Sequence, residues 1–170
     1  MESRLSQPES EARFASRETD AADMRAIQEF LDEALVSEVL NVIKSGKEAT
    51  VYRCRADPSL GVDFAAAKVY HSANHRSFQR SAVYEEGRQF GPGQVQRAIK
   101  NRSEFGREAQ LAFWVEHEFE VLSALHYAGA DVPAPFACTE KAILMEFVGD
   151  EDGDSPQLQY ARFADGEAEK

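Results

Sequence analysis

The sequence predicts an α+β domain in which an antiparallel sheet packs against one main helix. Short strand candidates separated by turns occupy the first half of the chain. One long amphipathic helix follows them, and an apolar strand candidate comes after that helix. The 170 residues suit about one domain, and 43% hydrophobic and 29% charged residues are ordinary for a globular protein.

The N-terminal part of the chain is expected to be a tail followed by a helix. Residues 1–24 are polar and acidic with little apolar periodicity, which is typical of a disordered segment. From Met24 to Val39 apolar residues recur at helical spacing, so a short helix is predicted there. These apolar residues are Ile27, Leu31, Leu35 and Val39.

Three strands are predicted next, the first two as a hairpin. Val39–Ile43 and Thr50–Ala56 flank a polar turn, and in the second of these strands apolar and small side chains alternate with arginines. A second turn, at residues 57–61, leads to Phe64–Tyr70. This third strand is apolar except for Lys68.

The second half of the chain begins with a long basic segment. Residues 71–106 are expected to form a flexible loop with some helical pieces, because they are rich in Arg, Ser, Gly and Gln. The clearest helix is predicted over 107–128. Residues 132–135 begin an extended segment, and Ala142–Val148 reads as an apolar strand interrupted by Glu146.

Charge and cysteine content limit the function classes. The net charge of −11 argues against binding of nucleic acid or an anionic membrane by the whole molecule. Cys54 and Cys138 have no CxxC spacing, so neither a disulfide framework nor a zinc site is expected, and a reducing cytoplasm is the default. The N-terminus lacks an apolar signal region, and no run approaches the roughly 18 apolar residues of a membrane span.

Lys68 and Glu118 are the most informative charged residues. An ammonium buried in an apolar strand is costly unless it is paired. On the long helix, Glu118 lies on the apolar stripe, four residues from Trp114 and four from Leu122. Taken singly, Lys68 could reach water from an edge strand and Glu118 could be solvated at the margin of the stripe. Taken together, the two residues explain each other as an ion pair.

The turn at residues 45–50 is a candidate for phosphate contact through its backbone amides. A P-loop is excluded for two reasons. Lys47 is followed by Glu48 instead of Ser or Thr, and Asn41 occupies the position where the P-loop pattern requires its first glycine. Of the three glycines in the glycine-rich pattern of protein kinases, only one is present here, at Gly46. Alone, this turn is better explained as an ordinary hairpin. The order of hairpin, strand with A-x-K, helix with a buried Glu and apolar strand ending in an acid is that of a protein-kinase N-lobe.

Two sequence blocks resemble RIO-family atypical serine/threonine protein kinases. Residues 43–52, IKSGKEATVY, resemble their nucleotide loop, in which an SGKEA-type sequence replaces three glycines. Residues 101–108, NRSEFGRE, together with the long insertion before the helix, resemble the type-one branch. The resemblance covers about residues 37–160. It implies a protein-kinase-like N-lobe, with a twisted antiparallel sheet and one αC-like helix.

The resemblance also implies roles at the phosphate end of an ATP site. Lys68 would contact the α- and β-phosphates of ATP, and Glu118 would hold Lys68 in place; these two form the implied catalytic pair. Ser45, Gly46 and Lys47 would cover the phosphates.

At the adenine end, the resemblance implies contacts from the strands and the hinge. Met145 would be the gatekeeper, and the backbones of Glu146 and Val148 would hydrogen-bond adenine. Val51 and Ala66 would pack on the adenine ring.

On this interpretation the chain divides into three parts. These are a disordered acidic tail at 1–24, an N-lobe at 25–148 that contains the loop 71–106, and a hinge exit with an acidic tail at 149–170. The C-lobe is expected to be absent, because no H-x-D string occurs. The Mg²⁺ ligands would come from that lobe, so no metal site is expected within this chain.

Two other functions are compatible with the sequence. The basic segment 76–107 could dock RNA or a ribosomal particle, since type-one relatives act in small-subunit ribosome maturation; alternatively, its basic residues form a solvated loop. Salt-dependent RNA binding that is lost when Arg97, Lys100 and Arg102 are neutralised would favour the first alternative. A regulatory half-kinase without catalysis is the other possibility. The protein substrate is not indicated by the sequence.

The 170-residue chain is expected to have little or no kinase activity, because positioning and metal stabilisation supply most phosphoryl-transfer catalysis. An autophosphorylation assay with radiolabelled ATP checks this expectation. Turnover by the pure chain would contradict it.

Overall fold

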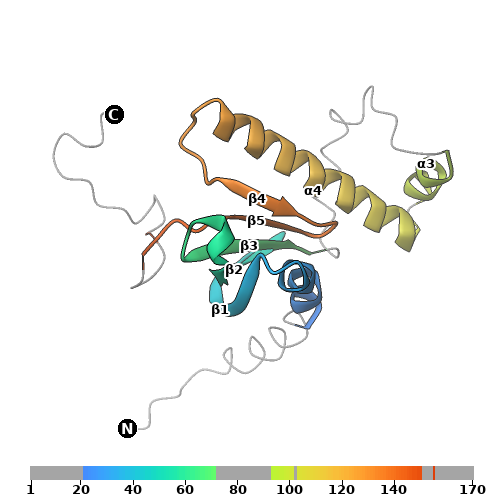
Figure 1. The fold of residues 1–170 in the computed structure, drawn as a ribbon. Helices are drawn as coiled ribbons and strands as arrows, with labels where there is room; N and C mark the ends of the chain where they lie inside the picture. Colours follow the sequence, from blue (N-terminus) through green and yellow to red (C-terminus); the bar gives the residue numbers. More distant parts are fainter. Residues whose placement is uncertain (1–20, 72–92, 102, 151–154, 156–170) are drawn as a thin grey trace, which may run out of the picture.

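The computed structural model describes residues 21–71, 93–101, 103–150 and 155. Its centre is a five-stranded antiparallel sheet in the order β1-β2-β3-β5-β4 (Figure 1). The strands are β1 (Val36–Ser45), β2 (Ala49–Ala56), β3 (Phe64–Tyr70), β4 (Pro135–Cys138) and β5 (Ala142–Glu146). The main helix is α4 (Glu104–Tyr127), and the predicted α+β class is confirmed.

The predicted helix from Met24 to Val39 is wrong in its second half. The helix occupies residues 21–32, and β1 begins at Val36. Between them Ala34 takes a left-handed conformation, with φ 54°, and the Leu35 N–H donates to the Phe30 carbonyl (2.9 Å). The chain turns here so that β1 can run back beside its helix, and the apolar spacing beyond the turn serves a strand instead.

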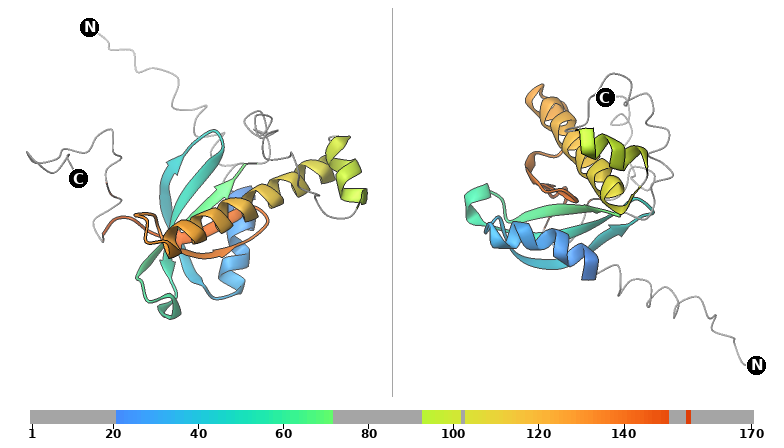
Figure 2. Two further views of the ribbon diagram at one scale, coloured as in Figure 1. Left: turned by 90° about the horizontal axis from the view of Figure 1, so that it is seen from above. Right: turned by 90° about the vertical axis from the view of Figure 1, so that its right-hand side faces the viewer.

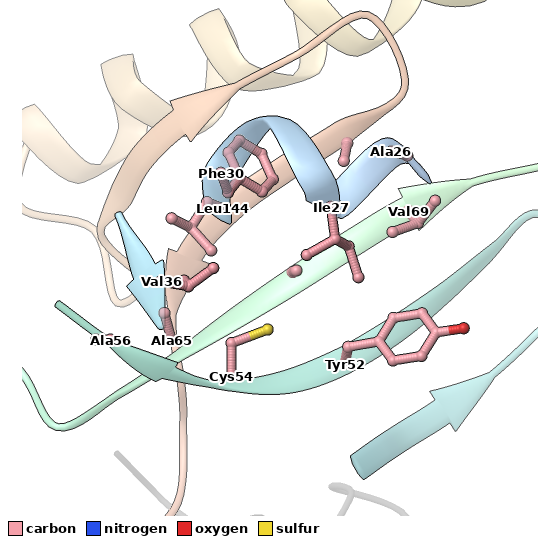
Figure 3. Packing of buried hydrophobic residues seen from close by; sticks show 12 residues of the cluster. Ala26, Ile27, Phe30, Val36, Tyr52, Cys54, Ala56, Ala65, Val69 and Leu144 are labelled. Atoms are coloured by element: carbon pink, nitrogen blue, oxygen red, sulfur yellow. The ribbon is translucent and has the colours of Figure 1, made fainter. Parts of the chain in front are cut away.

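The helix at residues 21–32 covers one face of the sheet (Figure 2). Ile27 and Phe30 are fully buried against side chains of the strands, among them Leu144 of β5 (Figure 3). The strands contribute every second residue to this cluster because side chains alternate across a sheet. The strand members are Val36, Tyr52, Cys54, Ala56, Ala65, Ala67, Val69, Ala142 and Leu144.

Buried polar groups fasten the same helix to the hairpin. The Tyr52 hydroxyl donates to the Asp23 carboxylate (2.8 Å), and Thr50 Oγ1 lies 2.9 Å from His71 Nε2. That imidazole nitrogen lies 3.8 Å from Asp23 Oδ2. Ser45 extends the chain of contacts, with its Oγ 3.2 Å from Thr50 Oγ1. Buried polar groups are tolerated when they bond to one another, so this network joins helix and hairpin in one arrangement.

Helix α4 lies on the opposite face of the sheet, against β4 and β5 (Figures 1 and 2). Leu111 and Val115 are buried there, in a cluster with Tyr70 and Ile143. Leu125, three residues beyond Leu122 on the same helix, is 45% exposed. The C-terminal turns of α4 are largely solvent-facing, so the stripe is longer than the surface that it meets.

The predicted loop at 71–106 contains the helical piece α3 (Gly93–Lys100), while residues 72–92 lie outside the described residues. The tail predicted at 1–24 is described only from residue 21, which is already helical, and the predicted exit at 149–170 is described only at 149, 150 and 155. Within the described ranges, no helix has the length and apolar character needed to span a membrane.

Gly106 allows α3 and α4 to pack closely. Ser103 caps α4 by accepting a hydrogen bond from the Gly106 N–H (3.1 Å), and its hydroxyl lies 3.3 Å from the Ala98 carbonyl. Gly106 is buried, and a Cβ atom at this position would overlap the backbone of Ala98 and Ile99 in α3. The glycine in the NRSEFGRE block therefore has a steric role between two helices.

Substitution Gly106→Ala is expected to lower the free energy of unfolding by about 1–3 kcal/mol and to loosen α3, since the overlap is with backbone rather than with a flexible side chain. Urea unfolding and hydrogen exchange of the α3 amides measure the two effects. Gly93→Ala is the matched control, because nothing lies within 4 Å of a Cβ atom there. A Gly106→Ala chain as stable as the control, with α3 amides equally protected, would refute this account.

Candidate functional site

Lys68 lies on the sheet face that carries α4, and its neighbours across the sheet are Val51 of β2 and Ile143 of β5. Two residues before Lys68 on β3, Ala66 pairs with Arg53 of β2 on one side and with Met145 of β5 on the other. Side chains at i and i+2 of a strand share a face, so these two rows lie side by side. The structure thus brings together predicted site residues from three strands.

The long helix supplies the partner of Lys68. Lys68 Nζ donates to Glu118 Oε1 at 2.5 Å, and both side chains are 30% exposed. The two alternatives of a lysine that reaches water and a solvated glutamate are therefore not what the structure shows. Val115 and Leu111, one and two turns earlier on α4, are buried against the sheet and thereby position Glu118 beside β3.

Aromatic side chains border the ion pair. Lys68 Nζ lies 4.9 Å from the centroid of the Tyr70 ring. The Tyr70 ring meets Trp114 edge to face, at 5.3 Å between centroids. Burial raises the pKa of the Tyr70 hydroxyl well above its usual value, and the neighbouring Glu118 carboxylate raises it further. The pattern of the amino-acid sequence alone indicated no role for Tyr70.

The predicted adenine contacts occupy one region of this face. Ala66 is buried, while Val51 and Met145 are half-buried. Their cross-strand pairing places small and apolar side chains next to the Lys68 row. Such a surface suits the flat, apolar face of an aromatic ring, with a cation at its end.

The turn between β1 and β2 is open to solvent. Ser45, Gly46 and Lys47 are all exposed. The Gly46 N–H donates to the Ala49 carbonyl (2.9 Å), so that amide is already used within the turn. Gly46 has no positive φ, and a Cβ atom there would meet its nearest neighbour, the Ala49 carbonyl oxygen, at an ordinary 3.4 Å. In this conformation the Gly46 amide, one of the backbone amides expected to contact phosphate, therefore bonds within the turn instead.

The segment after β5 is tied to the rest of the domain at Glu146. The Glu146 N–H donates to the Ala134 carbonyl (2.7 Å), and the Ala134 N–H donates to the Glu146 carboxylate (3.1 Å). A ligand contact at Glu146 would therefore use its carbonyl. The Val148 carbonyl accepts from the Ser155 N–H (3.0 Å), and Val148 is 57% exposed.

Arg53 connects β2 to this segment. Its guanidinium lies 3.8 Å from the centroid of the Phe64 ring and 4.8 Å from that of Phe147. It also donates to the Asp150 carbonyl (2.8 Å). Period-two alternation from Val51 could have placed Arg53 on the site face, but its contact with residues 147–150 depends on the path of the chain after β5.

The described part of the chain holds no group of three or more His, Cys, Asp or Glu side chains that could bind a metal ion.

Comparison with known proteins assigns the family. The model of the RIO domain (RIO1: RIO domain) matches residues 50–170. The chain belongs to the RIO domain family. It is 28% identical over 124 residues to the serine/threonine-protein kinase RIO1 of Chaetomium thermophilum, which is 73% of this chain and 23% of that protein. The chain therefore spans less than a quarter of the length of this RIO relative.

Family membership confirms the predicted resemblance and places the RIO domain on the observed fold, a mixed helix and antiparallel sheet like a kinase N-lobe. The matched RIO region begins at Thr50 and includes Lys68, Glu118 and Met145. Ser45, Gly46 and Lys47 lie just before it. The roles of these residues stay predictions.

Proposed function

We propose that this chain is the ATP-binding lobe of a RIO-type serine/threonine protein kinase. In the complete enzyme, the γ-phosphoryl group of ATP would pass to a Ser or Thr hydroxyl of a protein substrate. The observation that supports this proposal most directly is the ion pair between Lys68 and Glu118, at 2.5 Å. A half-buried cation held by a helix carboxylate, beside small apolar side chains, suits a ligand with an anionic end and a flat ring.

In this proposal Lys68 binds the α- and β-phosphates of ATP. Its ammonium is a donor of three hydrogen bonds, of which one goes to Glu118 in the structure. Glu118 restrains the lysine and lowers the cost of holding a cation away from bulk water. Ser45, Gly46 and Lys47 would cover the phosphates, with Ser45 anchored through Thr50 to the buried polar network.

The adenine ring would lie against Val51 and Ala66, next to Met145. On the backbone that follows β5, the base would accept from the Val148 N–H and donate to the Glu146 carbonyl, since the Glu146 N–H already serves Ala134. Arg53 holds this segment to β2 through Asp150, so it would keep the two walls of the site in register.

Mg²⁺ accompanies ATP in phosphoryl transfer. The residues around the proposed site do not fit a resident metal centre, since the described residues offer no cluster of three metal-binding side chains. We therefore assign no step through the metal to this lobe. Positioning of the nucleotide is the contribution proposed for it. The free thiols of Cys54 and Cys138 suit the reducing cytoplasm, which is the proposed location.

Lys68→Ala is expected to weaken binding of a fluorescent ATP analogue by about tenfold or more, because a hydrogen bond to a charged group contributes roughly 1.5–3 kcal/mol. Glu118→Gln is expected to weaken it less, since the lysine would remain but lose its restraint. Fluorescence titration of the 170-residue chain measures both changes.

Lys141→Ala and Glu108→Gln are the matched controls. Lys141 and Glu108 form a second ion pair between α4 and the strand region, at 3.1 Å, and neither belongs to the proposed site. Their substitution is expected to leave nucleotide affinity unchanged. Equal loss of affinity in both pairs would indicate that α4 is merely loosened, and absence of binding by the unsubstituted chain would reject the proposal.

A further inference from the structure

Tyr70 is fixed more firmly than packing of an apolar ring requires. It is the last residue of β3, two positions after Lys68, and therefore on the same face of the sheet. It is 3% exposed. Its backbone N–H donates to the Lys141 carbonyl (2.8 Å), which ties the end of β3 to the start of β5.

The ring of Tyr70 lies beside the Lys68 ammonium and against Trp114 of α4. One neighbour is the Lys68 ammonium, 4.9 Å from the ring centroid, within the range of a cation–π interaction. The other is Trp114, one turn before Glu118 on α4, which meets the ring at an interplanar angle of 74°. The ring thus contacts both the Lys68 cation and the helix that carries the Glu118 carboxylate.

The hydroxyl of Tyr70 is the unusual feature. It is completely shielded from solvent and makes no hydrogen bond of standard geometry with the described residues. Buried hydroxyl groups nearly always have a partner, so this one calls for an explanation. The charged group that acts on it is Glu118, whose carboxylate raises the pKa of the hydroxyl after the larger effect of burial.

Glu118 has room for a second donor. Lys68 bonds to its Oε1 atom, and a carboxylate can accept several hydrogen bonds. If either side chain moved toward the other, the Tyr70 hydroxyl could donate to the carboxylate. If Lys68 turned toward an anionic ligand, the carboxylate would then keep one donor in a half-buried place. A phenylalanine would fill the same volume but could not do this.

We propose that Tyr70 is a positioning residue that holds Lys68 and Glu118 in their paired arrangement, with its ring beside the ammonium and its hydroxyl beside the carboxylate. The consequence for nucleotide binding rests on the proposed function. The contact between Tyr70 and Glu118 can be tested without it.

A double-mutant cycle tests the proposal on the full 170-residue chain. Tyr70→Phe, Glu118→Gln and the double variant are compared with the unsubstituted chain, by titration with a fluorescent ATP analogue and by urea unfolding. Tyr70→Phe alone is expected to weaken nucleotide binding roughly threefold to tenfold, the effect of one hydrogen bond. In the Glu118→Gln background it is expected to have little effect, because the two residues act through each other.

Tyr127→Phe is the control for loss of a tyrosine hydroxyl, since Tyr127 ends α4 and is 95% exposed. It is expected to change neither measurement. If Tyr70→Phe has no effect on binding, or has the same effect with and without the Glu118 carboxylate, Tyr70 is only a packing residue and the proposal is overturned.

If the unsubstituted chain binds no nucleotide, the proposed function fails and the unfolding cycle decides about Tyr70. If the Glu118→Gln chain binds nucleotide too weakly to titrate, the unfolding cycle likewise tests the role of Tyr70. Non-additive effects of Tyr70→Phe and Glu118→Gln on the free energy of unfolding would support the positioning role. Additive effects would overturn it.

Discussion

The Lys68–Glu118 ion pair is the interaction on which the arrangement of this domain depends. A cation in an apolar strand needs a carboxylate at hydrogen-bond distance, and here the carboxylate comes from a helix 50 residues further along the chain. This contact limits both how far α4 can slide along the sheet and how far it can rotate about its own axis. Apolar packing at Leu111 and Val115 holds the helix against the sheet, but packing alone is less directional than a charged hydrogen bond.

Alternation along the strands gives the two faces of the sheet different tasks. One face packs Tyr52, Cys54 and their neighbours against the helix at residues 21–32, and burial raises the pKa of the Cys54 thiol to about 12, so this thiol is unreactive at neutral pH. The other face carries Lys68, Ala66 and Met145. A stable, apolar layer therefore supports the residues proposed to meet a nucleotide.

Polar contacts join the supporting layer to the site. The buried chain of Asp23, Tyr52, His71 and Thr50 reaches Ser45 at the turn proposed to cover phosphates. On the opposite side of the hairpin, Arg53 reaches the backbone after β5. Both sets of contacts restrain the hairpin. The buried polar chain ties it to the helix at residues 21–32, and Arg53 ties it to the segment proposed to bind the base. Between these two restraints, the turn at residues 45–47 is exposed to solvent.

The sequence by itself determined the α+β class, the strands around Lys68, the long helix and the RIO resemblance, because alternation, helical spacing and two specific blocks are local properties of the chain. It also indicated the ion pair, since an apolar strand and an apolar stripe each carried one unexplained charge. It did not determine where the first helix ends, because the spacing of Leu35 and Val39 fits both helix and strand.

Only the tertiary structure decided the end of that helix, the role of Gly106 between α3 and α4, and the contacts of Arg53 and Tyr70. Each depends on residues distant in sequence that meet when the sheet closes. The use of the Gly46 amide within its own turn was decided there too, because a glycine in a sequence shows conformational freedom but not the hydrogen bond that the folded chain makes.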